Sequence, residues 1–374
     1  MATVLILGGG FGGAATAITA QELLGDSHDI AVVDRAAQSY LCGVNPAVIT
    51  GEAEPMVRSI SGLAERGIRY VGTEILSIDV EGGAVETAMG PEPWDYLVVA
   101  LGVSYDWDAV PGSADAFSFY DTASATRLRQ RLAGFGGGSI VIGVGGSPYR
   151  CPPAPFEAIL MIDSYLRRRG IREDSDLTVV IPEPMPLGVA GPAASDRVTS
   201  ILTDRGITLG VGKRVDAVDG RTMRFDDGSA VDADIPITVP VHRVPNVVST
   251  SGLSGDKPFV PVDHDTLETA RPNIFAIGDV NTIPLGDKRG IPKAGVFAAG
   301  QGRHVAALIA FRLGTAPDPG GYDGVGHCFL MLGTDLGARV GGDFYGADVG
   351  LEVPSAAGRL AKDEWEEAWA RFEV

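Results

Sequence analysis

The chain has 374 residues, of which 45% are hydrophobic and 21% are charged. This composition is typical of a globular protein, the length is sufficient for two domains, and a disordered or fibrous chain is excluded. The formal net charge of −18 at pH 7 argues against binding to nucleic acid or to anionic lipid headgroups, since both depend on Lys and Arg.

The N-terminal region predicts a strand, a glycine-rich turn, a helix and a second strand. Residues 3–7 and 29–34 are apolar runs rich in β-branched residues, and residues 14–20 favour a helix. No basic leader segment precedes the first strand, and no stretch reaches the roughly 18 to 20 apolar residues of a membrane span. We therefore expect a soluble, cytoplasmic protein that begins with a βαβ unit.

The glycine turn of this unit has the form G-x-G-x-x-G, and a carboxylate ends the second strand. The first glycine permits the turn, the second lets the backbone approach a pyrophosphate, and the third allows the helix to pack on the strand. The acid can accept hydrogen bonds from an adenosine ribose. The residues expected to contact a dinucleotide are Gly8, Gly10, Phe11, Gly13, Asp34 and Arg35.

Further strands and helices alternate along the chain. Strands are predicted at residues 68–71, 96–100, 139–142, 177–181 and 273–277, and helices at 123–132, 156–169 and 193–205. This alternation predicts an α/β fold with two Rossmann-like dinucleotide-binding domains. We expect a discontinuous first domain (1–110 and 246–325), a second domain inserted into it (111–245), and a short C-terminal segment (326–374).

Two later segments favour FAD as the cofactor. Residues 94–102 and 273–280 resemble the second and third fingerprints of flavoproteins with two dinucleotide domains. In the third fingerprint, the carboxylate of an Asp accepts a hydrogen bond from a ribityl hydroxyl of FAD. The corresponding residue in this chain is Asp279. The resemblance adds Ala100, Leu101, Gly102, Gly278 and Asp279 to the cofactor-binding set.

The second glycine motif, residues 140–146, is interrupted. Prolines at positions 148, 152 and 153 stand where a phosphate-binding helix would begin. Because proline lacks an N–H donor and breaks the first helical turn, the motif predicts a degenerate NAD site.

Three cysteines, Cys42, Cys151 and Cys328, are too few for a disulfide scaffold and match no zinc spacing, so no metal is expected. The segments 151–157, 291–298 and 326–328 resemble the sulfide:quinone oxidoreductase and flavocytochrome c sulfide dehydrogenase flavoproteins. That resemblance implies that Cys151 and Cys328 form a disulfide or polysulfide beside the flavin. It further implies oxidation of sulfide or a related small sulfur compound, with a quinone or cytochrome c as the electron acceptor.

The same resemblance assigns supporting residues. Lys293 and Ala294 lie in the segment expected to contact the flavin, where an ammonium would stabilise the reduced ring. Glu157 is the candidate proton acceptor, although a carboxylate at a helix start can equally face solvent. Cys42 and Asn45 belong to the loop in which the flavocytochrome branch carries a covalent flavin tether, so Cys42 is either a tether or an untethered thiol.

Other interpretations remain open at this level. The sulfur chemistry can run in reverse, as in a disulfide or polysulfide reductase, and a non-catalytic electron-relay subunit is a further alternative. Trp365, Trp369 and Phe372 are predicted to share one face of a C-terminal helix. That face favours packing against the body or a second copy of the chain over peripheral association with a membrane, because the opposite face is acidic.

Overall fold

A parallel five-stranded sheet is the core of the first domain in the computed structural model, which describes residues 1–283, 285, 290–346 and 348–373. The strand order is β20-β9-β1-β2-β5. Both faces of the sheet are covered, so its central strands read as continuous apolar runs. The strands are β1 (Thr3–Leu7), β2 (Asp29–Val33), β5 (Arg69–Val71), β9 (Tyr96–Val99) and β20 (Ile274–Ala276).

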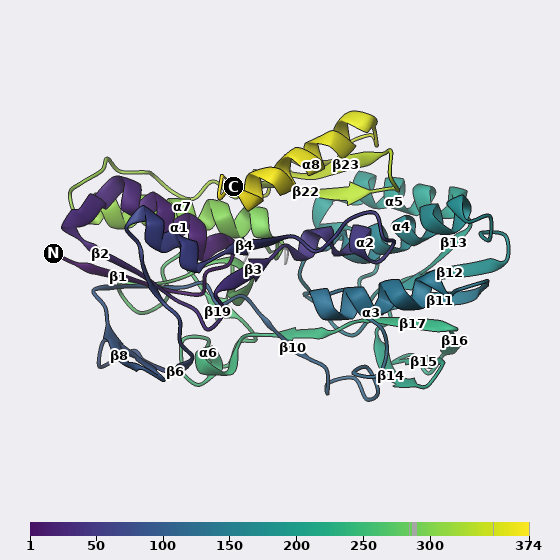
Figure 1. Cartoon of the computed structure of the whole chain (residues 1–374), viewed down its shortest axis with the longest axis horizontal. Coiled ribbons are helices and arrows are strands. Elements are labelled where there is room, and N and C mark those ends of the chain that lie inside the picture. Colours follow the sequence, from purple (N-terminus) through teal and green to yellow (C-terminus); the bar gives the residue numbers. More distant parts are fainter. Residues whose placement is uncertain (284, 286–289, 347, 374) are drawn as a thin grey trace.

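Helices α1 (Phe11–Leu24) and α7 (Gly295–Arg312) lie side by side on this sheet (Figure 1). Glycine permits their close approach: a Cβ atom on Gly302 would lie 2.4 Å from the carbonyl oxygen of Gly12. The buried sides of both helices consist largely of small residues. This packing holds the N-terminus of α1 at the carboxyl edge of the sheet, where open α/β sheets bind ligands.

A second parallel sheet, with the order β13-β12-β11-β17, lies at the other end of the molecule's long axis (Figure 1). Its strands are β11 (Gly138–Val144), β12 (Ser175–Val180), β13 (Ile207–Gly210) and β17 (Ile235–Val239), and its helices are α3 (Thr122–Ala133), α4 (Ala154–Arg168) and α5 (Pro192–Asp204). The chain passes between the two sheets at β10 (Ser104–Asp106) and β18 (Val241–Arg243), which pair antiparallel. The insertion of the second domain into the first is thus confirmed, while the boundaries at 110 and 245 stay predictions.

The described residues also form three three-stranded antiparallel sheets, which the sequence did not predict because most positions in their strands are exposed or half-exposed. They are β6 (Ile75–Asp79), β7 (Ala84–Thr87) and β8 (Gly90–Pro93); β14 (Val215–Asp219), β15 (Thr222–Phe225) and β16 (Ala230–Asp232); and β22 (Val325–Met331), β23 (Gly337–Asp343) and β24 (Asp348–Leu351). The smaller elements are β3 (Gln38–Tyr40), β4 (Val57–Ser59), β19 (Val260–Pro261), β21 (Asn281–Thr282), α2 (Asn45–Val48), α6 (Asn246–Ser249), and the 3-10 turns η1 (Gly25–Ser27), η2 (Cys42–Val44), η3 (Ser61–Arg66), η4 (Gly188–Ala190) and η5 (Gly278–Val280).

The C-terminal helix α8 (Ala356–Ala370) packs on the body of the protein through its aromatic face. Trp369 is fully buried, and the ring of Trp365 stacks on that of Phe11 with 5.8 Å between centroids. The buried Arg58 donates hydrogen bonds to the carbonyl oxygens of Trp369, at 3.1 Å, and Gly10, at 3.2 Å. Phe372 lies beyond the end of the helix. Within the described residues, we find no helix whose length and apolarity would let it traverse a bilayer.

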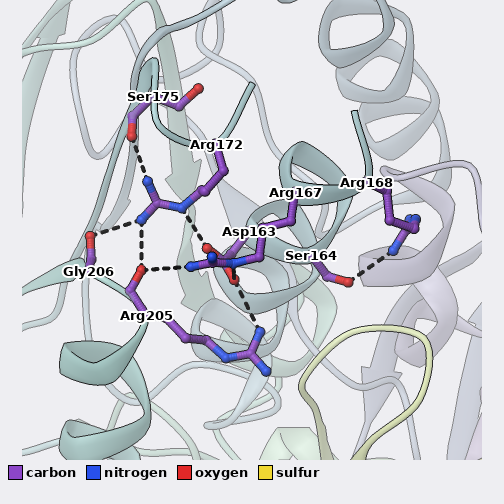
Figure 2. A network of polar contacts seen from close by, with 8 residues as sticks. All are labelled: Asp163, Ser164, Arg167, Arg168, Arg172, Ser175, Arg205 and Gly206. Carbon is purple, nitrogen blue, oxygen red and sulfur yellow. Dashed lines mark hydrogen bonds and ion pairs between the residues drawn. The ribbon is translucent and has the colours of Figure 1, made fainter. Parts of the chain in front are cut away.

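A buried carboxylate fastens the end of α4 to the neighbouring elements of the second domain. Asp163 is completely buried, and its oxygens accept hydrogen bonds from Arg167 at 3.0 Å, Arg172 at 2.6 Å and Arg205 at 3.1 Å. Figure 2 shows the three guanidinium groups converging on this side chain. Arg172 also donates to the carbonyl oxygen of Ser175, at the start of β12, and therefore links α4 to the sheet.

Candidate active site

A cavity of about 740 Å³ lies where the first domain, the second domain and the C-terminal segment meet. We call it the central cavity. Most of the residues singled out in the sequence line it: Gly8, Gly10, Phe11, Asp34, Arg35, Cys42, Ala100, Leu101, Gly102, Cys151, Glu157, Gly278, Asp279, Ala294 and Cys328. Gly13, Asn45 and Lys293 are not among the lining residues.

At one end, the central cavity meets the glycine turn that follows β1. Gly8 has a φ of +97°, and a Cβ atom there would lie 2.6 Å from the carbonyl oxygen of Ala100. The N–H of Gly9 donates to Asp34 at 2.8 Å, which fixes the carboxylate beside the turn. Gly13 acts from outside the cavity, since a Cβ atom on it would lie 1.8 Å from the carbonyl oxygen of Gly8. The N-terminus of α1 therefore faces the cavity as an anion-binding surface.

Asp279 supplies a polar group that lacks a partner within the described chain. It is half-buried in the wall of the central cavity, and its Oδ1, which is itself buried, has no hydrogen-bond partner among the described residues. Burial raises the pKa of Asp279, while the nearby Arg150 guanidinium and Lys293 ammonium act in the opposite direction. Because buried polar atoms are nearly always satisfied, this oxygen fits a ligand hydroxyl such as one from the ribityl chain of FAD.

Lys293 differs from the sequence-based expectation. Its ammonium donates to the carbonyl oxygens of Asp279, at 2.6 Å, and Asn281, at 2.9 Å, and lies 3.5 Å from the centroid of the Phe259 ring. Burial lowers its pKa to about 8. Lys293 therefore braces the backbone that carries Asp279 and does not line the cavity.

Asn45 is also placed outside the cavity lining. Its side-chain amide donates to the carbonyl oxygen of Phe119 at 2.8 Å, which ties helix α2 to the second domain. Asn45 therefore has a structural role between the two domains. The sequence around it did not reveal this contact.

The structure brings Cys151 and Cys328 together although 328 − 151 = 177 positions separate them. Cys328 lies on β22, and Cys151 lies in the loop before α4 with a φ of +58°. A hydrogen bond to Cys151 and burial together raise the pKa of the Cys328 thiol well above its usual range. Both thiols, like that of Cys42, are free in the described chain. Left-handed backbone is uncommon for a residue other than glycine, so the loop holds Cys151 in a specific, strained position.

Glu157, on the first turn of α4, faces the central cavity and not the solvent. Burial raises its pKa, and the ammonium of Lys362 on α8 opposes that shift through a buried ion pair. Lys362 also lines the cavity, yet the sequence interpretation missed it because the charged residues of α8 read as a solvated face. One signal was present: Lys362 falls on the same helical face as Trp365 and Trp369, at intervals of three and seven positions.

Arg150 adds positive charge next to Cys151. Its side chain lines the central cavity and donates to the hydroxyl of Tyr105 and, at 3.1 Å, to the carbonyl oxygen of Tyr120. It therefore points into the protein. Cys42 begins η2 at another part of the same wall, with its sulfur 3.9 Å from the carbonyl oxygen of Tyr40.

Comparison with protein families shows that residues 2–302 match the model described as pyridine nucleotide-disulphide oxidoreductase. The chain belongs to this family. Its central cavity, with the glycine turn before α1, the carboxylate of Asp34 and the unsatisfied Oδ1 of Asp279, fits FAD. The chain is accordingly a flavoprotein oxidoreductase with the two Rossmann-like domains predicted from the sequence.

Among members with assigned activities, the chain is similar to the mitochondrial sulfide:quinone oxidoreductase of Mus musculus, with 22% identity over 88% of this chain and 75% of that protein. It is 26% identical to the sulfide-quinone reductase of Aquifex aeolicus, over 89% of this chain and 82% of that one. The crystal structure of the sulfide:quinone oxidoreductase from Aquifex aeolicus superposes with a TM-score of 0.88 at 24% identity, covering 98% of this chain and 90% of that chain. A type II NADH:quinone oxidoreductase of Staphylococcus haemolyticus is 25% identical over 89% of this chain and 90% of that protein.

The family is named for pyridine nucleotides, but in this member a long loop and not a helix follows the second glycine turn. Strand β11 ends at Val144 and α4 begins only at Ala154, after a loop that contains Cys151. A Cβ atom on Gly145 would already lie 3.0 Å from the Val110 side chain. The start of α4 contributes Ala154 and Glu157 to the central cavity. The N–H of Ala154 donates to the carbonyl oxygen of Cys151 at 2.8 Å, and Pro153 and Pro155 have no N–H, so this helix start offers few donors to a phosphate.

Proposed function

We propose that this flavoprotein oxidises sulfide through a disulfide or polysulfide of Cys151 and Cys328 and passes the electrons to a quinone. The observation that carries the proposal is the meeting of these two thiols in the central cavity, beside a buried carboxylate and a cationic side chain. The relatives named for sulfide and quinone supply the choice of donor and acceptor.

The exchange is written for hydrosulfide and a Cys151–Cys328 disulfide. Hydrosulfide forms a bond to the sulfur of Cys328, and the bond between the two cysteines breaks to release the Cys151 thiolate. Attack on Cys328 makes Cys151, the residue next to Arg150, the leaving thiolate. FAD, when bound, supplies the acceptor for the two electrons that leave the sulfur pair.

The chain's own residues have defined tasks in this exchange. Arg150 attracts the anionic donor into a molecule whose overall charge is strongly negative. Glu157 accepts the proton that hydrosulfide loses as its sulfur becomes bonded to Cys328.

A second pocket beside the central cavity supports a quinone as the acceptor. An open pocket of about 420 Å³ shares Phe11, Phe329 and Trp365 with the wall of the central cavity. Aromatic side chains of this kind suit the flat, apolar ring of a quinone. A cytochrome c would instead dock at the surface, and the acceptor assay described next separates the two.

Anaerobic absorbance spectra of the yellow holoprotein, titrated first with sulfide and then with NADH, test the proposal. We expect rapid bleaching of the flavin band by sulfide and recovery on addition of a soluble quinone. Bleaching by NADH alone would favour a disulfide or polysulfide reductase, and bleaching by neither donor would favour an electron-relay subunit. If cytochrome c restores the flavin band and a quinone does not, the acceptor is a cytochrome c and not a quinone.

A further inference from the structure

Three charged side chains form a buried chain that leads away from the central cavity. Lys362 of α8 forms an ion pair with Glu157 of α4 and lies 3.8 Å from Glu366, one turn further along α8. The exposed fractions of the Lys362, Glu157 and Glu366 side chains are 6%, 5% and 13%. Glu157 and Lys362 line the cavity, whereas Glu366 is not among its lining residues. The order from cavity to surface is therefore Glu157, Lys362, Glu366.

Two carboxylates share one ammonium in this cluster. With both ionised, the three groups carry a net charge of −1 in surroundings that exclude water, which is costly. Binding one proton makes the cluster neutral, so it takes up and releases a single proton readily. The carbonyl oxygen of Gly43 accepts a hydrogen bond from Lys362 at 3.0 Å and holds the ammonium between the two acids.

The other charges around the cluster support the same conclusion. On α8 itself, Arg359 and Asp363 act on Glu366 with opposite signs, and from the cavity side Cys151 acts on Lys362. Burial raises the pKa of Glu366 to about 7, with the Lys362 ammonium opposing and the Glu157 carboxylate adding to that shift. Glu366 therefore exchanges its proton with water near neutral pH.

We propose that Glu157, Lys362 and Glu366 form a relay that carries the proton lost by sulfide from the central cavity to the surface. The inference rests on the proposed function. As the donor sulfur bonds to cysteine, its S–H bond breaks and an O–H bond forms on Glu157. Lys362 then gives one ammonium proton to Glu366 and regains one from Glu157, and Glu366 releases its proton to water. Only protons move along the three side chains, and the electrons leave through the sulfur pair.

The test compares Glu366→Gln with Glu367→Gln in the holoenzyme. The control removes the same charge at the next position of α8, where the side chain is 72% exposed and lies 3.6 Å from Arg371. The rate of flavin reduction by sulfide is measured by stopped flow from about pH 5 to about pH 9, and Glu366→Asp serves as the conservative rescue. For Glu366→Gln we expect a rate at neutral pH lower by about tenfold to a hundredfold and no inflection near pH 7, with wild-type behaviour in the control.

A second readout does not depend on turnover. Infrared difference spectra of the oxidised holoenzyme across neutral pH should show a protonated carboxyl band that is lost in Glu366→Gln and retained in Glu367→Gln. If sulfide reduces both the wild type and Glu366→Gln at equal rates with the same pH profile, the relay is wrong while the proposed function stands. If sulfide does not reduce the wild type, the proposed function fails and the relay loses its substrate.

Discussion

The backbone N–H of Cys151 donates a hydrogen bond of 2.6 Å to the carbonyl oxygen of Lys293. Cys151 belongs to the inserted domain and Lys293 to the segment before α7 in the first domain. The side chain of Lys293 is in turn bonded to the carbonyl oxygen of Asp279. One lysine therefore connects the reactive loop of one domain to the predicted flavin-contacting residue of the other.

Replacing Lys293 with Met should lower the stability of the protein and its affinity for FAD without abolishing the reaction with sulfide. The carbonyl oxygens of Asp279 and Asn281 would each lose a charged donor, at a cost of about 1 to 3 kcal/mol of unfolding free energy. Urea denaturation and the dissociation constant of FAD measure the effect, with the exposed Lys257→Met as the matched control. An unchanged midpoint and unchanged FAD affinity would show that the lysine does not brace the site.

Replacing Asp163 with Asn should destabilise the second domain strongly. Three arginines converge on this fully buried carboxylate, and the side chain of one of them, Arg172, is only 11% exposed. The variant therefore leaves a largely buried guanidinium without its charged partner, at a cost of about 3 to 5 kcal/mol. The measurement is thermal or urea unfolding, and Asp176→Asn, at an exposed position on β12, controls for the loss of charge. Equal stabilities of the two variants would contradict the role of the network.

His242 should make the protein sensitive to acid. Burial and the Arg150 guanidinium lower its pKa to about 3 from an ordinary value of 6.5. The folded state therefore resists a proton that the unfolded state binds, so His242 contributes stability above pH 6.5 that is lost as the pH falls towards 3, by about 1.4 kcal/mol for each pH unit. His242→Phe retains the packing on Tyr105 and should flatten this dependence, measured by urea unfolding over the same range. His327→Phe, at an exposed position, is the control. If the unfolding free energy of His242→Phe depends on pH as steeply as that of the wild type, His242 is not the source of the acid sensitivity.

The sequence predicted the parts of the site that rest on local patterns. The glycine turn before α1, the carboxylate Asp34 and the third fingerprint at Asp279 each follow from a strand that ends at the same sheet edge, so their convergence is a property of the fold. The resemblance to sulfide-oxidising flavoproteins supplied the pairing of Cys151 with Cys328, which no spacing rule gives.

Other parts depend on tertiary packing that the sequence does not display. Lys362 and Glu366 occur in a helix whose charges suggest solvent exposure. The packing of α8 against the rest of the chain, where Lys362 reaches Glu157 of α4 and Gly43 of η2, buries them. Lys293 lies in a segment expected to contact the flavin, but its ammonium instead contacts two backbone carbonyl oxygens and the ring of Phe259. In each case a long, flexible side chain reaches partners that are distant in the sequence, so its neighbours along the chain do not reveal its contacts.

A covalent bond between Cys42 and the flavin is the riskiest prediction. Cys42 lines the central cavity, in the loop for which the sequence resemblance suggests a flavin tether. We expect the yellow colour to remain with the protein after acid denaturation and filtration, and to pass through the filter with Cys42→Ser. Free FAD in the filtrate of the wild type would show that Cys42 is an untethered thiol.

Sulfide-dependent flavin reduction in Cys151→Ser and Cys328→Ser tests the central claim most directly. A hydroxyl cannot undergo thiol–disulfide exchange, so both variants should bind FAD with a normal spectrum yet lose reduction by sulfide by at least about a thousandfold in anaerobic stopped flow. Rapid reduction by sulfide in both variants, with FAD fully bound, would contradict the account.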